Sequence, residues 1–176
     1  MKKEKWLIAL AAGAGVAGLA YALWPKNKIP KSAIVQRFDK NKYMGLWYEV
    51  ARLPNRIEKN LKNLTDEYSL NDDGSIKVVT RAYNFDKNKP VEATGNARFA
   101  GPDNIGRLKV AYFLPIYLDY NILDIDATYQ YAMVSGSSPD YLWIISRENS
   151  IPDAVKERFL VKASNLGFDV SKLEWM

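Results

Sequence analysis

The chain has 176 residues, with 25 Lys and Arg, 20 Asp and Glu, and neither Cys nor His. It therefore contains no disulfide, no Ser-His-Asp triad, no thiolate nucleophile and no imidazole or thiolate metal ligand, and we expect no catalytic residues, no metal site and no cofactor. This length fits one domain of roughly 130 to 150 residues plus an appendage.

The positive charge is concentrated near the N-terminus. Residues 1–42 carry nine Lys or Arg and two acidic residues, a net of +7, whereas residues 43–176 carry 16 basic and 18 acidic residues, a net of −2. A nucleic-acid-binding domain needs its positive charge on the folded surface, so we expect no nucleic-acid partner. We divide the chain into a basic flank (1–5), an apolar segment (6–24), a basic tether (25–42) and a folded domain (43–176).

The apolar segment 6–24 has no charged residue and begins and ends with Trp. As a helix it would be about 28 Å long, close to the thickness of the bilayer core, with a Trp near each interface. This pattern predicts a hydrophobic helix that spans the membrane as an anchor. A secretory signal peptide, with a small-residue cleavage site at Ala20-Tyr21-Ala22, is the alternative. Both interpretations predict that the domain is exported.

Small residues in this segment leave the oligomeric state open. Ala14, Gly18 and Ala22 follow one another at intervals of four residues, which would let two spanning helices pack closely. Bulky Leu10 interrupts the row one turn earlier. A homodimer is therefore one alternative. Lys residues flank both sides of the segment, so the flanking charge does not fix the orientation.

The domain shows strand-like alternation between turn signals and no helical period before residue 147. Turns such as Asn71-Asp72-Asp73-Gly74 suit hairpins, because Gly and Asp tolerate positive φ. Residues 38–44 resemble a short turn that closes one end. We predict eight strands, at 47–52, 61–70, 76–83, 91–99, 107–113, 117–125, 129–135 and 141–146. An up-and-down antiparallel barrel is the simplest topology that leaves no free edge.

The pattern changes to a helical period after Arg147. Ser150 is a candidate N-cap, Pro152 suits the first turn, and apolar residues recur at intervals of three and four until Gly167. We expect one amphipathic helix packed on the outside of the barrel. Residues 168–175 are expected to form a short last strand beside the first one.

Three motifs follow one another in the domain at specific spacing. Gly45-Leu46-Trp47 opens the first strand, Asp126 and Tyr129 flank the turn before the seventh, and Arg147 ends the eighth. With Gly167-Phe168-Asp169-Val170, these motifs resemble the lipocalin family, within it the bacterial outer-membrane lipocalins and animal apolipoprotein D. The resemblance implies an all-β, eight-stranded antiparallel barrel with one C-terminal α-helix outside. It also implies that Gly45, Trp47 and Arg147 form the barrel floor, with the indole under the guanidinium.

The resemblance also implies that one face of each strand lines a ligand cavity. The expected ligand is a fatty acid or a lysophospholipid, bound for lipid storage or transport. The candidate ligand-binding residues are Tyr68, Val78, Thr80, Ala93, Ala97, Val110, Tyr112, Tyr120, Ile122, Ala132 and Trp143. Arg52 and Arg107 are either partners of an anionic head group near the rim or solvated surface charges.

Two other function classes stay open beside the carrier. One is an envelope interaction or structural protein whose barrel is filled by side chains. The other is an enzyme built on Asp124 and Asp126, or on Glu49, but nothing in the sequence supplies an opposed acid or base partner, so we do not expect catalysis.

The anchor departs from the pattern of the bacterial relatives. Those proteins are usually lipoproteins attached through an acylated Cys, which this chain lacks. We expect a location in the cell envelope with the barrel facing the periplasm. The resemblance favours the outer membrane, whereas an apolar spanning helix favours the inner membrane.

Overall fold

The computed structural model describes residues 29–176, so the predicted anchor or signal segment 6–24 lies outside the described part of the chain. The strands in chain order are β1 (Gly45–Arg52), β2 (Leu61–Leu70), β3 (Ile76–Asn84), β4 (Lys89–Phe99), β5 (Arg107–Phe113), β6 (Ile116–Ile125), β7 (Tyr131–Ser135), β8 (Leu142–Ser146) and β9 (Glu174–Trp175). The helices are the 3-10 helix η2 (Lys31–Ala33), α2 (Lys40–Tyr43), α3 (Asp153–Asn165) and the 3-10 helix η3 (Val170–Lys172).

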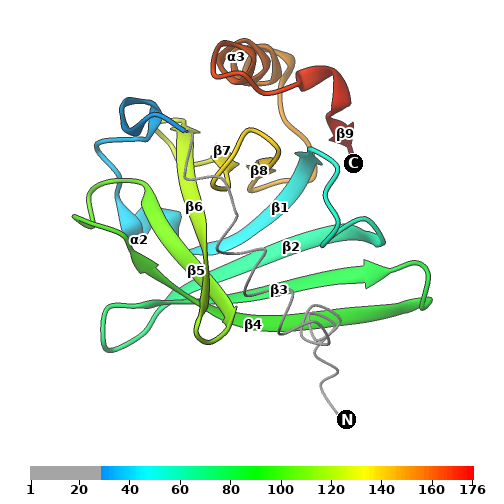
Figure 1. The fold of residues 1–176 in the computed structure, drawn as a ribbon, viewed down its shortest axis with the longest axis horizontal. Helices are drawn as coiled ribbons and strands as arrows, with labels where there is room; N and C mark the ends of the chain where they lie inside the picture. Colours follow the sequence, from blue (N-terminus) through cyan, green and yellow to red (C-terminus); the bar gives the residue numbers. More distant parts are fainter. Residues whose placement is uncertain (1–28) are drawn as a thin grey trace.

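The strands form one closed antiparallel barrel (Figure 1). Each strand from β2 to β7 pairs with the next one in the sequence, and β1 closes the ring by pairing with both β2 and β8. The short strand β9 adds to the outer edge of β1, where Trp175 pairs with Ala51. The predicted eight-stranded up-and-down barrel with a C-terminal helix outside is therefore confirmed.

The barrel has two different ends. The end at which β1 begins is covered by α2, and Asp39 caps this helix by accepting hydrogen bonds from the amides of Asn41 and Lys42. Upstream of α2, Val35 donates its amide to the carbonyl of Ile122 and accepts from Gly106, which holds this segment against β5 and β6. We call this the closed end. The opposite end carries the loops 53–60, 85–88, 114–115 and 136–141.

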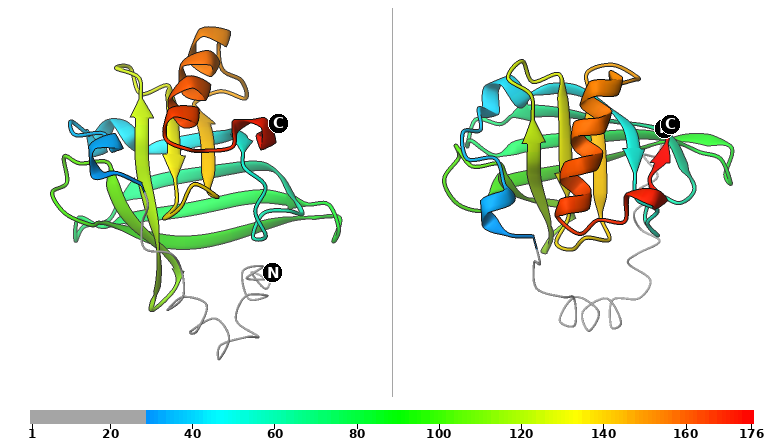
Figure 2. Two further views of the ribbon diagram at one scale, coloured as in Figure 1. Left: turned by 45° about the horizontal axis from the view of Figure 1, so that its top comes forward. Right: turned by 90° about the horizontal axis from the view of Figure 1, so that it is seen from above.

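The helix α3 lies across the outer face of β6 to β8 (Figure 2). Its Phe159 and Ala163 are buried against outward-facing Leu123, Met133 and Ile144. Two predictions for this region are wrong in detail. Pro152 rather than Ser150 is at the N-cap, and Ser150 instead accepts a hydrogen bond from Ser146 through its carbonyl. Residues 170–172 form η3, so the last strand is limited to two residues.

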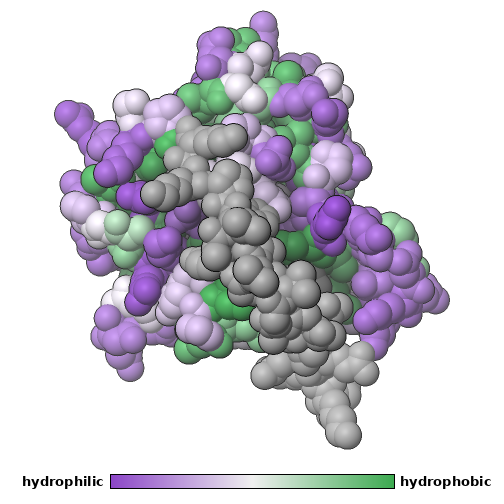
Figure 3. All heavy atoms as spheres, viewed as in Figure 1, coloured by the Kyte–Doolittle hydropathy of each residue, from purple (hydrophilic) through white to green (hydrophobic). Residues whose placement is uncertain are grey.

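Within residues 29–176, no helix is both long enough and apolar enough to cross a bilayer. The surface of the projecting β3–β4 hairpin is mainly hydrophilic in the space-filling view (Figure 3).

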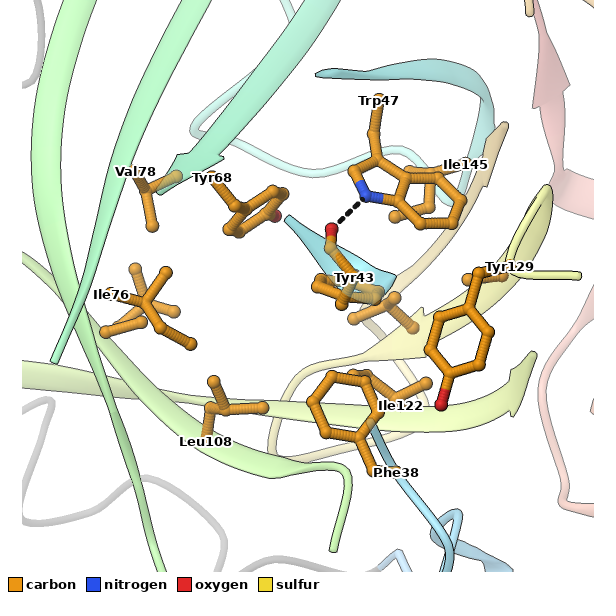
Figure 4. Close-up of a cluster of buried hydrophobic side chains, with 14 residues drawn as sticks. Phe38, Tyr43, Trp47, Tyr68, Ile76, Val78, Leu108, Ile122, Tyr129 and Ile145 are labelled. Carbon is orange, nitrogen blue, oxygen red and sulfur yellow. Dashed lines mark hydrogen bonds between the residues drawn. The ribbon is translucent and has the colours of Figure 1, made fainter. Parts of the chain in front are cut away.

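The core of the barrel is gathered at the closed end. Figure 4 shows Phe38 and Tyr43 from the segment that covers this end pointing toward side chains of the barrel wall. Ile76 and Val78 of β3 and Ile122 of β6 are at most 1% exposed. Such side chains are close-packed and leave no room for water. The interior of the barrel near the closed end is therefore filled by side chains.

Candidate ligand-binding site

The closed end is organised around the predicted floor residues. The guanidinium carbon of Arg147 lies 3.9 Å from the ring centroid of Trp47. The indole is fully buried and donates its Nε1 proton to the carbonyl of Tyr43 over 2.8 Å. Gly45 has a φ of +96°, and a Cβ there would stand 3.4 Å from Nη1 of Arg147. A glycine thus allows both the left-handed turn and the close approach of the guanidinium.

Arg147 also ties the chain to itself at this end. Its three guanidinium nitrogens donate to the carbonyls of Lys42, Tyr43, Met44, Leu46 and Tyr129. Burial lowers the pKa of Arg147, while the nearby phenols of Tyr43 and Tyr68 act in the opposite direction. The side chain stays charged, because a guanidinium remains protonated in proteins at any ordinary pH. Arg147 thereby holds the backbone segments of the closed end together through hydrogen bonds to five carbonyls.

The eleven candidate ligand-binding residues all lie on the interior face of the barrel wall, but at different depths. Val78, Ala97, Ile122 and Ala132 are at most 1% exposed and belong to the packed core. Tyr68, Thr80, Ala93 and Val110 are buried as well. Tyr112, Tyr120 and Trp143 are only partly buried although they face inward. Space accessible to solvent therefore lies beside these three aromatic side chains, above the packed floor.

A layer of polar side chains crosses the middle of the barrel. Asp66 accepts a short hydrogen bond from Thr80, whose hydroxyl oxygen lies 2.6 Å from the hydroxyl of Tyr112. The hydroxyl of Tyr68 contacts Asp66 at 3.5 Å and that of Tyr120 at 2.8 Å. A further contact of 2.6 Å joins Tyr120 to Tyr43. We call Asp66, Thr80, Tyr68, Tyr112 and Tyr120 the polar layer.

The polar layer shifts the pKa values of its members. Burial raises the pKa of Asp66 to about 6; hydrogen bonds from Thr80 and Tyr68 oppose this shift, while the charge of Glu58 adds to it. Burial also raises the pKa values of Tyr43, Tyr68, Tyr112 and Tyr120, so these phenols are neutral hydrogen-bonding groups. The layer carries one group that titrates near neutral pH, Asp66.

Asp66 was not among the residues singled out from the sequence. Its signal was present, because Asp66 and Tyr68 are two residues apart on one strand and must share a face. With Tyr68 placed inside, alternation alone puts Asp66 inside. A carboxylate at an interior position departs from the usual pattern of barrels filled by apolar residues.

A second polar group lies toward the opposite end. Arg52 is buried and donates from Nη1 to Glu49 over 2.7 Å, and from Nη2 to the carbonyls of Glu58 and Leu61. The carboxylate of Glu58 accepts from the indole of Trp143 over 2.9 Å. Burial raises the pKa of Glu49 well above its usual value, and Glu58 adds to this shift, while Arg52 opposes it.

Arg52 does not match the surface position expected for a solvated charge, whereas Arg107 is partly exposed on the outer face of the barrel. Arg52 is a buried, paired side chain rather than an exposed one. Arg107 is at the closed-end terminus of β5, and its buried Nε has no hydrogen-bond partner. The two guanidinium groups therefore lie at opposite ends of the barrel.

Apolar side chains form a collar above the polar layer. Leu61, Leu64, Ala82 and Val91 make one buried cluster. Leu61 pairs with Asn84, and Ala82 pairs with Val91, which places the cluster at the end of β2 to β4 away from α2. We call these four residues the apolar collar. Two surface hollows, of about 520 Å³ over α3 and about 400 Å³ beside η2, lie outside the barrel.

The carboxylates considered for catalysis have structural partners. Asp124 forms ion pairs with Arg158 and Lys162 of α3, at 3.4 and 3.1 Å. Asp126 accepts the amides of Thr128, Gln130 and Tyr131 and so fixes the turn before β7. Hydrogen bonds of this kind hold the pKa of Asp126 below its usual value against the effect of burial. Within residues 29–176, no three His, Cys, Asp or Glu side chains are grouped to hold a metal ion.

Comparison with known proteins places this barrel in a family. The family model described as a lipocalin-like domain matches residues 38–176. The outer membrane lipoprotein Blc of Escherichia coli K12 is 40% identical over 170 residues, which cover 97% of this chain and 96% of that protein. Apolipoprotein D of Macaca fascicularis is 27% identical over 183 residues, covering 95% and 92% of the two chains.

A comparison of structures gives the same fold. Lobster apocrustacyanin A1 superposes with a TM-score of 0.69 at 18% identity, covering 86% of this chain and 88% of that one. At this identity the likeness concerns the fold alone. The family assignment rests on the lipocalin-like match and on the relatives of higher identity. The chain belongs to the lipocalin family.

Proposed function

We propose that this protein binds one single-chain lipid, a fatty acid or a lysophospholipid, inside its barrel and stores or transports it in the cell envelope. The observation that carries the proposal is the partial burial of Tyr112, Tyr120 and Trp143, which face inward above a packed floor. Eight-stranded barrels of this family are wide enough to hold one small ligand. The apolar collar would cover an alkyl chain, which gains roughly 0.8 kcal/mol for each buried methylene.

The envelope location is supported by the name of one relative and by the N-terminal sequence. The Escherichia coli protein is named an outer membrane lipoprotein. This chain has no Cys to acylate, and residues 6–24 are uncharged and apolar. We propose that this segment attaches the barrel to a membrane and that the barrel faces the periplasm. An apolar spanning helix favours the inner membrane.

A second candidate is a filled barrel that acts through its outer surface. The close packing of Ile76, Val78 and Ile122 favours this function, because a ligand would have to displace these side chains to reach the floor. The two candidates differ in one measurable property. The carrier takes up lipid in a saturable way, and the filled barrel does not.

Displacement of a fluorescent fatty acid from the full chain tests the two candidates. We expect one probe for each protein, displaced by palmitate or by a lysophospholipid. Ala93 is buried on the inner face opposite Thr80, so Ala93→Phe should fill the accessible space and weaken binding about tenfold or more. The control Thr94→Phe adds the same ring on the exposed face of the same strand. Absence of saturable binding by the unmodified chain would favour the filled barrel.

A further inference from the structure

A hollow of about 400 Å³ lies on the outside of the barrel, between η2 and the loop 100–106. Ile34, Pro102 and Ile105 give it an apolar wall, and Lys31 and Arg107 add two cationic side chains. Lys31 belongs to η2 and Arg107 is the first residue of β5, so two segments far apart in the sequence meet here. A hollow of this kind suits a ligand that carries both an anionic group and hydrocarbon.

The two cations of the hollow have no acidic partner. Within residues 29–176, neither Lys31 nor Arg107 takes part in an ion pair, and Asp103 of the loop 100–106 pairs with Lys40 over 2.7 Å instead. The Nε of Arg107 is buried and donates no hydrogen bond to this part of the chain. A buried donor without an acceptor is unfavourable, and an anion held in the hollow would supply the acceptor.

The donors of the hollow suit a phosphate group. A guanidinium presents its N–H groups as a planar fork that binds two phosphate oxygens together, and the Lys31 ammonium adds a second positive charge. Ser32 is exposed at the edge of the hollow, where its hydroxyl can donate to the same group. Gln36 has a structural role instead, because its Nε2 donates to the carbonyl of Ile34 over 2.7 Å.

The proposed attachment through residues 6–24 brings this hollow close to a bilayer. Ile29 is 4% exposed and belongs to the same buried cluster as Ile34, so the chain is fixed to the barrel from this residue on. The five residues from Trp24 to Ile29 extend to at most about 18 Å. Lys31 follows two residues later. The hollow therefore stays within reach of the lipid head groups of the membrane that holds the anchor.

We propose that the hollow between η2 and the loop 100–106 binds the head group of an anionic phospholipid of that membrane, with its phosphate on Lys31 and Arg107 and its less polar part against the apolar wall. This site lies outside the barrel and goes beyond the proposed carrier function, on which it rests only for the attachment through residues 6–24. A head group bound there turns the surface around η2 toward the bilayer.

Native mass spectrometry of the full chain in a neutral detergent tests this site, with equimolar phosphatidylglycerol and phosphatidylcholine of identical acyl chains. The phosphate of phosphatidylcholine is balanced by its own ammonium, so we expect phosphatidylglycerol to be retained at least about fivefold more. Arg107→Gln should reduce this ratio to about twofold or less. Lys31→Gln, at an exposed position, should have the same effect and replaces Arg107→Gln if that variant does not fold.

Arg98→Gln is the matched control for Arg107→Gln. It removes the same guanidinium charge from an exposed position of β4 that does not line the hollow, and it should leave the ratio unchanged. Equal retention of the two lipids by the unmodified chain overturns this inference. An equal loss of preference in Arg98→Gln and Arg107→Gln also overturns it, because the effect would then come from net charge alone.

Two competitors separate this site from its alternatives. Saturating palmitate should leave the ratio unchanged, because it would occupy the interior of the barrel. Loss of the preference with palmitate would place the phospholipid inside the barrel, which overturns the external site and supports the carrier. Inorganic phosphate at about 1 mM should displace little lipid, because it gains nothing from the apolar wall, and full displacement would overturn the assignment to a lipid. Failure of palmitate to bind would overturn the carrier function alone.

Discussion

The guanidinium of Arg147 donates hydrogen bonds to five backbone carbonyls at the closed end. Lys at this position keeps the charge but not the planar fork, so several carbonyls lose their donor. We expect Arg147→Lys to lower the free energy of unfolding by about 2 to 3 kcal/mol. Urea denaturation followed by circular dichroism measures this change.

Arg98 provides the matched control for that substitution. Its guanidinium carbon lies 4.1 Å from the ring centroid of Tyr117, but the side chain is exposed. Arg98→Lys should therefore change stability by about 0.5 kcal/mol or less. Equal effects of the two substitutions would mean that water replaces the Arg147 fork at the closed end.

Asp66 makes the stability of the fold depend on pH. In the folded protein burial raises the pKa of Asp66 from its usual value of 3.8 to about 6, so folding favours the protonated form. This contribution is fully present below about pH 4 and is lost as the pH rises through 6. We expect Asp66→Asn to be more stable than the unmodified chain by about 2 to 3 kcal/mol at pH 8, with the difference disappearing near pH 4. Urea denaturation across this pH range measures it.

Glu67→Gln is the reference for that series, because Glu67 is exposed and pairs with Arg81 at 2.8 Å on the outer face. Its effect should be small and nearly constant between pH 6 and 8. A constant difference between Asp66→Asn and the unmodified chain from pH 8 to 4 would contradict the assignment of a raised pKa to Asp66.

At the scale of elements, alternation and turn residues were sufficient to predict where the strands lie. The predicted ranges 61–70 and 107–113 coincide with β2 and β5. The seventh strand was placed two residues too early, because Asp126 accepts the amides of Gln130 and Tyr131 and turns the chain there. The polar layer was not predictable as a unit, because it depends on contacts between four strands. The face of the strand on which each of its side chains lies was predictable from alternation.

The helix α3 is held to the barrel by a small number of side chains. Phe159 is fully buried between the helix and the sheet, whereas Val161 is 56% exposed. Lys162 donates to the carbonyl of Leu123 over 2.6 Å and fixes the register of the helix on β6. The amphipathic stripe predicted for the helix is thus only partly buried, with Ala154 on the exposed side.

We expect Phe159→Ala to lower the free energy of unfolding by about 3 to 4 kcal/mol, because it leaves a cavity that the rigid sheet cannot close. Val161→Ala removes apolar atoms from an exposed position of the same helix and should cost less than about 0.5 kcal/mol. Thermal unfolding of the two variants measures both effects. A small effect of Phe159→Ala would indicate that α3 is docked mainly by Lys162 and its ion pairs.

At the scale of the whole molecule, the barrel combines a closed end that is filled by packed side chains with an opposite end at which interior side chains are partly exposed to solvent. At the closed end, hydrogen bonds hold the segment around Val35 against the strands, α2 covers the opening, and Arg147 lies over the ring of Trp47. The other end is bounded by loops and by side chains that remain partly exposed. Closure itself was predictable, because β1 has to pair with both neighbours to leave no edge.

Amide hydrogen exchange should separate these two halves. With saturating palmitate, we expect slower exchange in the loop 53–60 and around Leu61, Ala82 and Val91, because an alkyl chain bound at the collar stabilises that end against local opening. Exchange at Ile76 and Leu108 should stay unchanged, because these residues are already packed in the core. Ala93→Phe should show the slow exchange at the collar without ligand. Protection gained mainly around Ile76 and Leu108 would show that the ligand displaces the packed side chains of the closed end. The assignment of the ligand to the end of the barrel away from α2 would then be wrong.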